Sequence, residues 1–259
     1  MPDGPSYAML GRGRWAARIQ NILDSQGRRV ELIGETRQQP HESDASYQSR
    51  LSTQMSASGA EIAWICIPPG NQIPLMIEAA IAAGLHVVVE KPWTCSRSQT
   101  EHLMTLAKNN RRVVAIHYEY CFLEAVERWR RDLHNGIGLR FGGRFTLSRP
   151  DRLGISALEN LGCHLLAIRA YAAPLSEISE ISCGYDLPDE RRLWVKKGGN
   201  TLDAIDFWGT HEPLIQRFIA VFEAALCGAS FALNLDFASR VFDDVKALRS
   251  SNNIPPTHA

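Results

Sequence analysis

The sequence has no excess of charge of either sign. Lysine and arginine total 28 residues and aspartate and glutamate also total 28, so the formal net charge is zero. Nucleic acids and anionic membrane surfaces attract strongly basic proteins, so this balance argues against either as the main partner. The balance also leaves little charge repulsion between copies of the chain, and we expect a homodimer or a larger homo-oligomer.

Metal-ligand spacing and long apolar runs are also missing. The six cysteines form no C-x-x-C pair, so the sequence predicts neither a metal site nor a redox dithiol. No apolar run approaches the ~18 residues that span a bilayer. The chain also does not open with a basic segment leading into an apolar one. We therefore expect a cytoplasmic protein with reduced cysteines.

The sequence does contain a glycine-rich turn between a short apolar stretch and a helical pattern. Residues 11–16 read G-x-G-x-x-A. Gly11 permits a tight turn, Gly13 lets the backbone approach a pyrophosphate, and Ala16 is small enough for close packing of a helix on a strand. The pattern predicts a dinucleotide-binding turn, the alternative being an ordinary glycine turn. The residues expected to contact the cofactor here are Gly11, Arg12, Gly13, Arg14, Trp15 and Ala16.

The second predicted strand covers residues 29–33, and the residues that follow it bear on the choice of cofactor. An acidic side chain at this place binds the ribose 2′-hydroxyl of NAD, whereas an arginine accommodates the 2′-phosphate of NADP. Here Glu35 is followed by Thr36 and Arg37, so both signals are present. Because Arg12 adds positive charge in the glycine turn, the sequence favours NADP, with NAD as the alternative.

A β-branched run, residues 86–90, is the stretch around which the first half is organised. It lies between Gly84 and Pro92, which is typical of a buried strand of a parallel sheet. Glu90 and Lys91 come at its carboxyl end, where open α/β sheets bind their ligands. Pro92 favours an extended Lys91, and a cis peptide bond is one way to achieve the turn. We expect Lys91 to meet a substrate; the alternative is an exposed lysine after an edge strand.

Strands and helices alternate through the first half of the chain, which predicts a doubly wound parallel sheet, a Rossmann domain, over residues 1–120. The expected strands are residues 6–10, 29–33, 61–67, 86–90 and 111–117. After residue 120 the strands are grouped, which predicts a smaller α+β domain with a mostly antiparallel open sheet over residues 121–259. Its expected strands are residues 139–148, 177–185, 191–197 and 201–208, and its expected helices are residues 122–133, 157–172, 212–227 and 235–250.

Four polar or aromatic residues follow the fifth predicted strand. They are His117, Tyr118, Glu119 and Tyr120. Their place after the carboxyl end of a strand predicts contacts with substrate. For Glu119 the alternative is an ion pair with a nearby arginine.

The order of the motifs resembles that of the glucose–fructose oxidoreductase and inositol dehydrogenase family (Gfo/Idh/MocA). The glycine turn is followed by Ile67-Pro68-Pro69, then by A-G-L-H-V-V-V-E-K-P at residues 83–92, and then by Asn160-Leu161-Gly162-Cys163-His164. The chain is similar to a short and divergent member over nearly its whole length. The resemblance implies a Rossmann domain, a second domain whose open sheet often mediates oligomerisation, and a nicotinamide cofactor.

The resemblance also implies roles for individual residues. Lys91 and His164 match the catalytic lysine and histidine, and Asn160 stands where many members have an aspartate. For His164 the alternative is a core histidine of an apolar helix. Further expected cofactor contacts are Ile67, Pro68, Pro69, Asn71, Glu90, Lys91 and Pro92. The expected substrate contacts are Lys91, His117, Tyr118, Glu119, Tyr120, Asn160 and His164.

These residues predict a direction for the reaction. A lysine beside a nicotinamide donates a hydrogen bond or proton to a carbonyl or imine as hydride arrives. Asparagine can orient His164 but cannot take a proton. The sequence therefore favours an NAD(P)H-dependent reductase of a small carbonyl or imine. One alternative is a sugar or cyclitol dehydrogenase, and another is a non-catalytic dinucleotide-binding sensor or assembly subunit.

Overall fold

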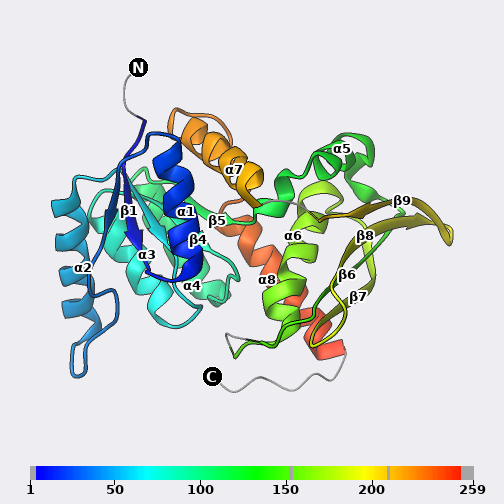
Figure 1. Ribbon diagram of the computed structural model, residues 1–259, viewed down its shortest axis with the longest axis horizontal. Coiled ribbons are helices and arrows are strands. Elements are labelled where there is room, and N and C mark those ends of the chain that lie inside the picture. Colours follow the sequence, from blue (N-terminus) through cyan, green and yellow to red (C-terminus); the bar gives the residue numbers. More distant parts are fainter. Residues whose placement is uncertain (1–3, 152–153, 209–210, 252–259) are drawn as a thin grey trace. The chain divides into compact units, whose positions relative to one another are not determined.

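The computed structural model describes residues 4–151, 154–208 and 211–251, and it folds into two units (Figure 1). The first takes in residues 1–117 and 215–239, and the second takes in residues 118–214 and 240–259. The boundary expected near residue 120 does not anticipate the return of residues 215–239 to the first unit. Within the described residues, no helix is long and apolar enough to cross a membrane.

The first unit is built on a five-stranded parallel sheet with the order β2-β1-β3-β4-β5. Its strands are β1 (Tyr7–Leu10), β2 (Val30–Leu32), β3 (Ile62–Ile65), β4 (His86–Glu90) and β5 (Val114–His117). All residues of β1 and β3 are buried, which explains why these strands read as continuous apolar runs. The doubly wound parallel sheet predicted from the alternation is confirmed.

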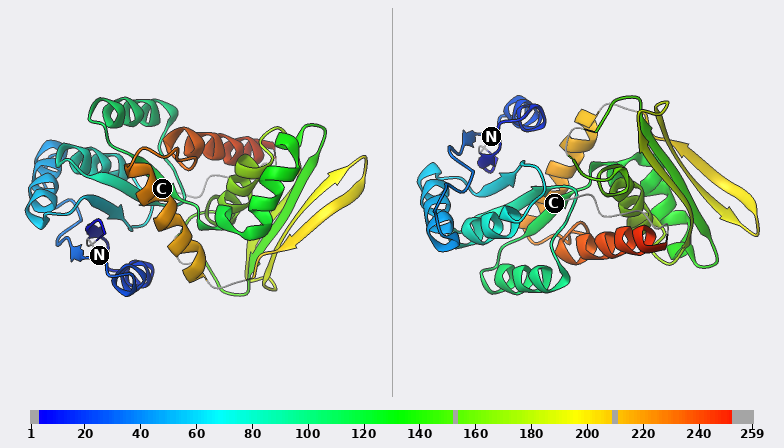
Figure 2. Two further views of the ribbon diagram at one scale, coloured as in Figure 1. Left: turned by 90° about the horizontal axis from the view of Figure 1, so that it is seen from above. Right: turned by 90° about the horizontal axis from the view of Figure 1, so that it is seen from below.

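Helices cover both faces of this sheet (Figure 2). They are α1 (Arg14–Ser25), α2 (Asp44–Ser58), α3 (Gln72–Ala82), α4 (Arg97–Asn109) and most of α7 (His211–Leu226). Figure 2 shows α2, α3 and α4 on one face and α1 and α7 on the other. Ser96 caps α4 in a capping box with Gln99.

A partly buried polar contact holds α7 to the first unit. The hydroxyl of Tyr7 donates to Glu223 at 2.8 Å, and Arg28 binds both oxygens of the same carboxylate at 2.9 and 2.6 Å. Burial, followed by the charge of Glu223, raises the pKa of Tyr7 well above its ordinary value. Phe218 and Phe222 of α7 are also buried, as expected for core residues. A helix late in the sequence therefore completes the first unit.

The second unit is built on a four-stranded mixed sheet with the order β7-β6-β8-β9. Its strands are β6 (Arg140–Leu147), β7 (Glu177–Tyr185), β8 (Glu190–Lys197) and β9 (Asn200–Asp206). Two of its pairs are antiparallel, and β6 with β7 is parallel. Its helical elements are η1 (Glu119–Phe122), α5 (Glu124–Asp132), η2 (His134–Gly136), η3 (Leu158–Gly162), α6 (Cys163–Ala172) and α8 (Leu235–Ser251), whose residues from Arg240 onward belong here.

The core of the second unit lies between one face of this sheet and helices α5 and α6. Trp129 of α5, Leu165 of α6 and Leu193 of β8 are among its buried members. Arg169 of α6 pairs with Asp244 of α8 at 2.8 Å and so ties these helices together. The predicted helices and strands of this half are all present, with bounds that differ by a few residues.

All six cysteines are free thiols. Burial raises the pKa of Cys95 and of Cys183 to about 12, and it raises the pKa of Cys121 as well. A thiol with a raised pKa is a poor nucleophile at neutral pH. These cysteines therefore act in packing.

Candidate active site

The glycine turn has the geometry that its sequence predicts. Gly11 has a φ of +139°, and a Cβ at this position would overlap the carbonyl oxygen of Cys66. Only glycine tolerates both constraints. Gly13 caps the start of α1 with an ordinary φ of −76°, and a Cβ there would meet nothing within 4 Å. The amide end of α1 therefore faces open space, which fits the pyrophosphate of a dinucleotide.

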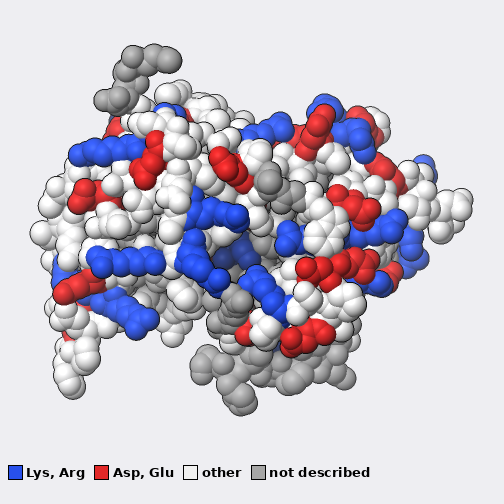
Figure 3. Space-filling view, in the orientation of Figure 1, with Lys and Arg blue, Asp and Glu red and all other residues white. Residues whose placement is uncertain are grey.

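Positive charge gathers around this turn. Arg12, Arg14 and Arg18 are exposed, and Figure 3 shows arginine and lysine side chains on the face of the first unit where α1 lies. The guanidinium of Arg12 lies 3.8 Å from the point where Gly34 would carry a Cβ. Arg12 thus reaches the end of β2, where a dinucleotide places its adenosine ribose.

The loop after β2 is held by hydrogen bonds to its own neighbours. The carboxylate of Glu35 accepts from Gln39 at 3.1 Å, and Tyr47 donates to the carbonyl of Thr36 at 2.7 Å. Arg50 of α2 donates to the carbonyls of Glu35 and Arg37. The exposed side chain of Arg37 does not take part in these bonds.

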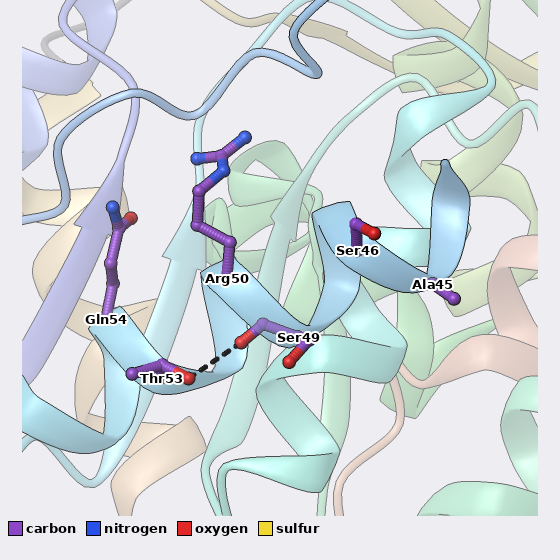
Figure 4. A pocket seen from close by; sticks show the side chains of 6 residues that line it. All are labelled: Ala45, Ser46, Ser49, Arg50, Thr53 and Gln54. Atoms are coloured by element: carbon purple, nitrogen blue, oxygen red, sulfur yellow. Dashed lines mark hydrogen bonds between the residues drawn. The ribbon is translucent and has the colours of Figure 1, made fainter. Parts of the chain in front are cut away.

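A shallow hollow lies beside this loop on the outer side of α2 (Figure 4). It is lined by Ala45, Ser46, Ser49, Arg50, Thr53 and Gln54. Thr53 donates to the carbonyl of Ser49 within the helix, and Arg50 is engaged with Glu42 and the loop. These groups serve the helix and the loop, so we place no chemistry there.

The strand register brings Lys91 to the same sheet edge as the glycine turn. Leu10 of β1 pairs with Ile65 of β3, and Ile65 pairs with Val89 of β4. Gly11 and Glu90 therefore follow equivalent positions, two strands or roughly 10 Å apart. Lys91 comes next, and its bond to Pro92 is cis.

The loop after β3 lies between these two strands at the same edge. It holds Ile67, Pro68, Pro69 and Asn71. Asn71 precedes α3 without a side-chain cap hydrogen bond. The expected cofactor residues all belong to the first unit, and they lie at or next to the carboxyl edge of its sheet.

Glu90 and His117 are placed inside the first unit. Oε1 of Glu90 accepts from Nε1 of Trp64 at 3.0 Å and lies 2.9 Å from Nδ1 of His117. His117 has no exposed surface, and its ring packs 4.6 Å from the ring of Phe218. His117 is therefore buried beside Glu90, and its contact with substrate stays a prediction.

The second unit brings the other expected residues together around Tyr120. The ring of Tyr120 lies 4.7 Å from that of His164 and 5.5 Å from that of His211. Nδ1 of His211 lies 3.3 Å from Oε1 of the buried Glu119. A histidine thus lies beside Glu119, and the ion pair with an arginine offered as the alternative for Glu119 stays a prediction. Glu119, Tyr120 and His164 form a polar and aromatic cluster, and Tyr118 beside them is buried as well.

Asn160 has a partner of its own in this unit. Its amide nitrogen donates to the hydroxyl of Tyr185. Burial raises the pKa of Tyr185. The side chain of Asn160 is therefore directed at β7 as well as lying one helical turn before His164.

The cluster around Tyr120 has two further members that no sequence motif indicates, Arg191 and His211. Arg191 of β8 donates from Nη1 to the hydroxyl of Tyr120 at 2.9 Å, and His211 opens α7. Arg191 stands in an alternating run whose face was not assigned from the sequence, and only the alternation with Leu193 and Val195 could have indicated it. Among the described residues no group of three or more side chains could hold a metal ion.

Comparison with known proteins adds a family. Residues 6–118 match the model of an oxidoreductase family with an NAD-binding Rossmann fold, Gfo/Idh/MocA. This first part of the chain therefore matches the NAD-binding domain of that family. No curated protein matches the sequence.

Solved structures share the fold over the whole chain. GenD2 from gentamicin A biosynthesis, in complex with NAD, has a TM-score of 0.75 at 15% identity and covers 100% of this chain and 98% of its own. The WlbA dehydrogenase from Thermus thermophilus, with NAD and UDP-GlcNAcA, has a TM-score of 0.70 at 15% identity and coverages of 98% and 97%. The UDP-N-acetylglucosamine 3-dehydrogenase GnnA from Acidithiobacillus ferrooxidans has a TM-score of 0.74 at 13% identity. The match covers 96% of this chain and 97% of GnnA. At this identity the likeness shows the fold.

Proposed function

We propose that the protein is a nicotinamide-dependent dehydrogenase that interconverts an alcohol of a sugar and the corresponding ketone. The observation that carries the proposal is the shared sheet edge of Gly11 and Lys91, because it sets the backbone of Lys91 about 10 Å from a dinucleotide turn. The sugar dehydrogenases among the structural relatives support the substrate class over the small carbonyl or imine favoured by the sequence.

The residues present fit a dinucleotide. Gly13 leaves space at the amide end of α1, and Arg12 and Arg14 add positive charge beside it. We propose NADP as the preferred cofactor, since the carboxylate of Glu35 is bonded to Gln39 while Arg12 reaches the end of β2. When bound, the cofactor supplies or accepts the hydride.

The protein then has to bind the sugar oxygen and manage its proton. Lys91 donates a hydrogen bond to the oxygen of the reacting carbon and supplies a proton when a ketone is reduced. His164 acts on the same substrate as a hydrogen-bonding group, held against the ring of Tyr120. Asn160 cannot carry a proton, so we propose that ketone reduction is the faster direction.

A cofactor titration and a turnover assay test this proposal. NADPH should bind more tightly than NADH, and Arg12→Ala should reduce this difference in affinity between the two cofactors. Keto sugars and sugars should then be tested with both cofactors in both directions. Binding of cofactor without turnover of any sugar or keto sugar would instead favour a non-catalytic dinucleotide sensor.

A further inference from the structure

Arg191 occupies an unusual place on the sheet of the second unit. It shares a face of β8 with Leu193 and Val195, both of which are fully buried. Its cross-strand partner on β6 is Phe145, whose ring centroid lies 5.0 Å from the guanidinium carbon. Trp208 lies on the guanidinium at 5.4 Å. The positively charged Arg191 therefore lies next to Leu193, at one end of an apolar row on this face of β8.

The other arginines of this sheet are neutralised by carboxylates. Arg192, the next residue, lies 3.8 Å from Asp206, and Arg144 lies 3.2 Å from Glu190. Among the described residues, no carboxylate comes within 4 Å of Arg191. The carboxylate of Asp189 accepts a hydrogen bond from the backbone amide of Ser148, which lowers its pKa, and the charge of Arg191 lowers it further. Arg191 thus has no ion-pair partner within 4 Å in the part of the chain that the structure describes.

The hydrogen-bonding capacity of Arg191 is also largely unused. Its guanidinium has five N–H donors. Nη1 donates to the neutral hydroxyl of Tyr120, and its Nε is buried without a hydrogen-bond partner among the described groups. Half-burying a charge without pairing it is costly. With aromatic rings against it, the guanidinium offers its in-plane edge, which suits an anion with two oxygens.

We propose that Arg191 binds an anionic group of the substrate, so that the substrate is a sugar bearing a carboxylate or a phosphate. This inference rests on the proposed function and names its substrate class. The ring of Tyr120, to which Arg191 donates, lies 4.7 Å from the ring of His164. The bound anion therefore lies next to the imidazole that the family resemblance assigns to catalysis, and Arg191 is itself partly exposed to solvent.

Calorimetric titration with paired probes tests the inference independently of turnover. Glucuronic acid and glucose differ in one carboxylate, and glucose 6-phosphate and glucose differ in one phosphate. The whole protein, loaded with reduced cofactor, should bind at least one anionic probe tenfold or more tightly than its neutral counterpart. The pair that shows the difference identifies the anion as carboxylate or phosphate.

Variants assign the effect to Arg191. Arg191→Gln should abolish the discrimination, whereas the matched control Arg192→Gln should retain it, because Arg192 pairs with Asp206 on the opposite face. Arg191→Gln is compared with a second variant if it lowers the thermal unfolding midpoint. Arg191→Lys keeps the positive charge but loses the paired N–H donors of the guanidinium, so it should retain part of the discrimination between the probes. Equal binding of each pair by the wild type, no binding of any probe, or discrimination that survives Arg191→Gln overturns the inference. Discriminating binding without turnover overturns the dehydrogenase proposal and leaves the anion site standing.

Discussion

The carboxylate of Glu90 holds the ring of His117, with Oε1 2.9 Å from Nδ1. The two residues are cross-strand partners at the ends of β4 and β5. Trp64 donates to the same oxygen from β3. The glutamate that precedes Lys91 thus joins three strand ends, which fixes the backbone from which Lys91 projects.

This contact predicts that two substitutions of Glu90 lower the free energy of unfolding by different amounts. Glu90→Leu removes the acceptor of two buried donors, and each unsatisfied donor costs about 1–3 kcal/mol. We expect a loss of that order in the free energy of unfolding, measured in urea. Glu90→Gln retains a carbonyl oxygen and should lose much less. Equal stability of Glu90→Leu and the wild type would contradict the role given to Glu90.

The two glycines of the turn should respond differently to substitution. Gly11→Ala introduces backbone strain and an overlap with Cys66, so unfolding should become easier by about 1–3 kcal/mol. Gly13→Asp fits the observed φ and the open space, but its carboxylate would repel a pyrophosphate. We expect near-native stability and at least tenfold weaker binding of NADPH in a fluorescence titration. Unchanged NADPH binding by Gly13→Asp would remove the turn from the cofactor site.

Asn160 offers a test of the direction of the reaction. In Asn160→Asp the new carboxylate accepts a hydrogen bond from Tyr185 in place of donating one, and it can share a proton. We expect the rate of sugar oxidation to rise relative to the rate of ketone reduction. The comparison requires initial rates in both directions at several pH values. A ratio that stays constant shows that Asn160 does not set the direction.

Asp203 predicts how the stability of the second unit depends on pH. Burial opposes its ionisation, but hydrogen bonds from Trp129 and Arg128 outweigh burial and lower its pKa. A lowered pKa in the folded state contributes stability above the unfolded value of about 3.9, and this is lost as the pH falls through the folded value. Urea unfolding between pH 3 and pH 7 should therefore show a loss below about pH 4. Asp203→Asn should show a smaller loss, and an identical pH profile would refute this assignment.

Most of the fold could be predicted from the sequence because its signals are local. The G-x-G-x-x-A turn, the β-branched run before Lys91 and the cap at Ser96 each act within a few residues. The return of α7 could not be predicted, because it depends on the contact between Tyr7 and Glu223 across 216 positions. The parallel pairing of β6 with β7 depends likewise on tertiary packing.

The candidate site was less predictable for the same reason. Lys91 and the glycine turn share an edge because strand order follows from the alternation of elements. His117 was expected to face a substrate because it ends a strand, but whether an end residue points into the core depends on neighbours such as Phe218. Arg191 and His211 lie far from any motif, and only the fold brings them to Tyr120.

The most direct test of the account follows the hydride and depends on Lys91. Purified protein is incubated with a keto sugar and with NADPH or NADH carrying deuterium at the transferable position, and the product is analysed by mass spectrometry. The account predicts one deuterium per product molecule with the wild type and with the control Lys108→Met, an exposed lysine of α4. Lys91→Met should form no labelled product while still binding the cofactor. Labelled product from Lys91→Met at the wild-type rate, or none from the wild type with any keto sugar, would contradict it.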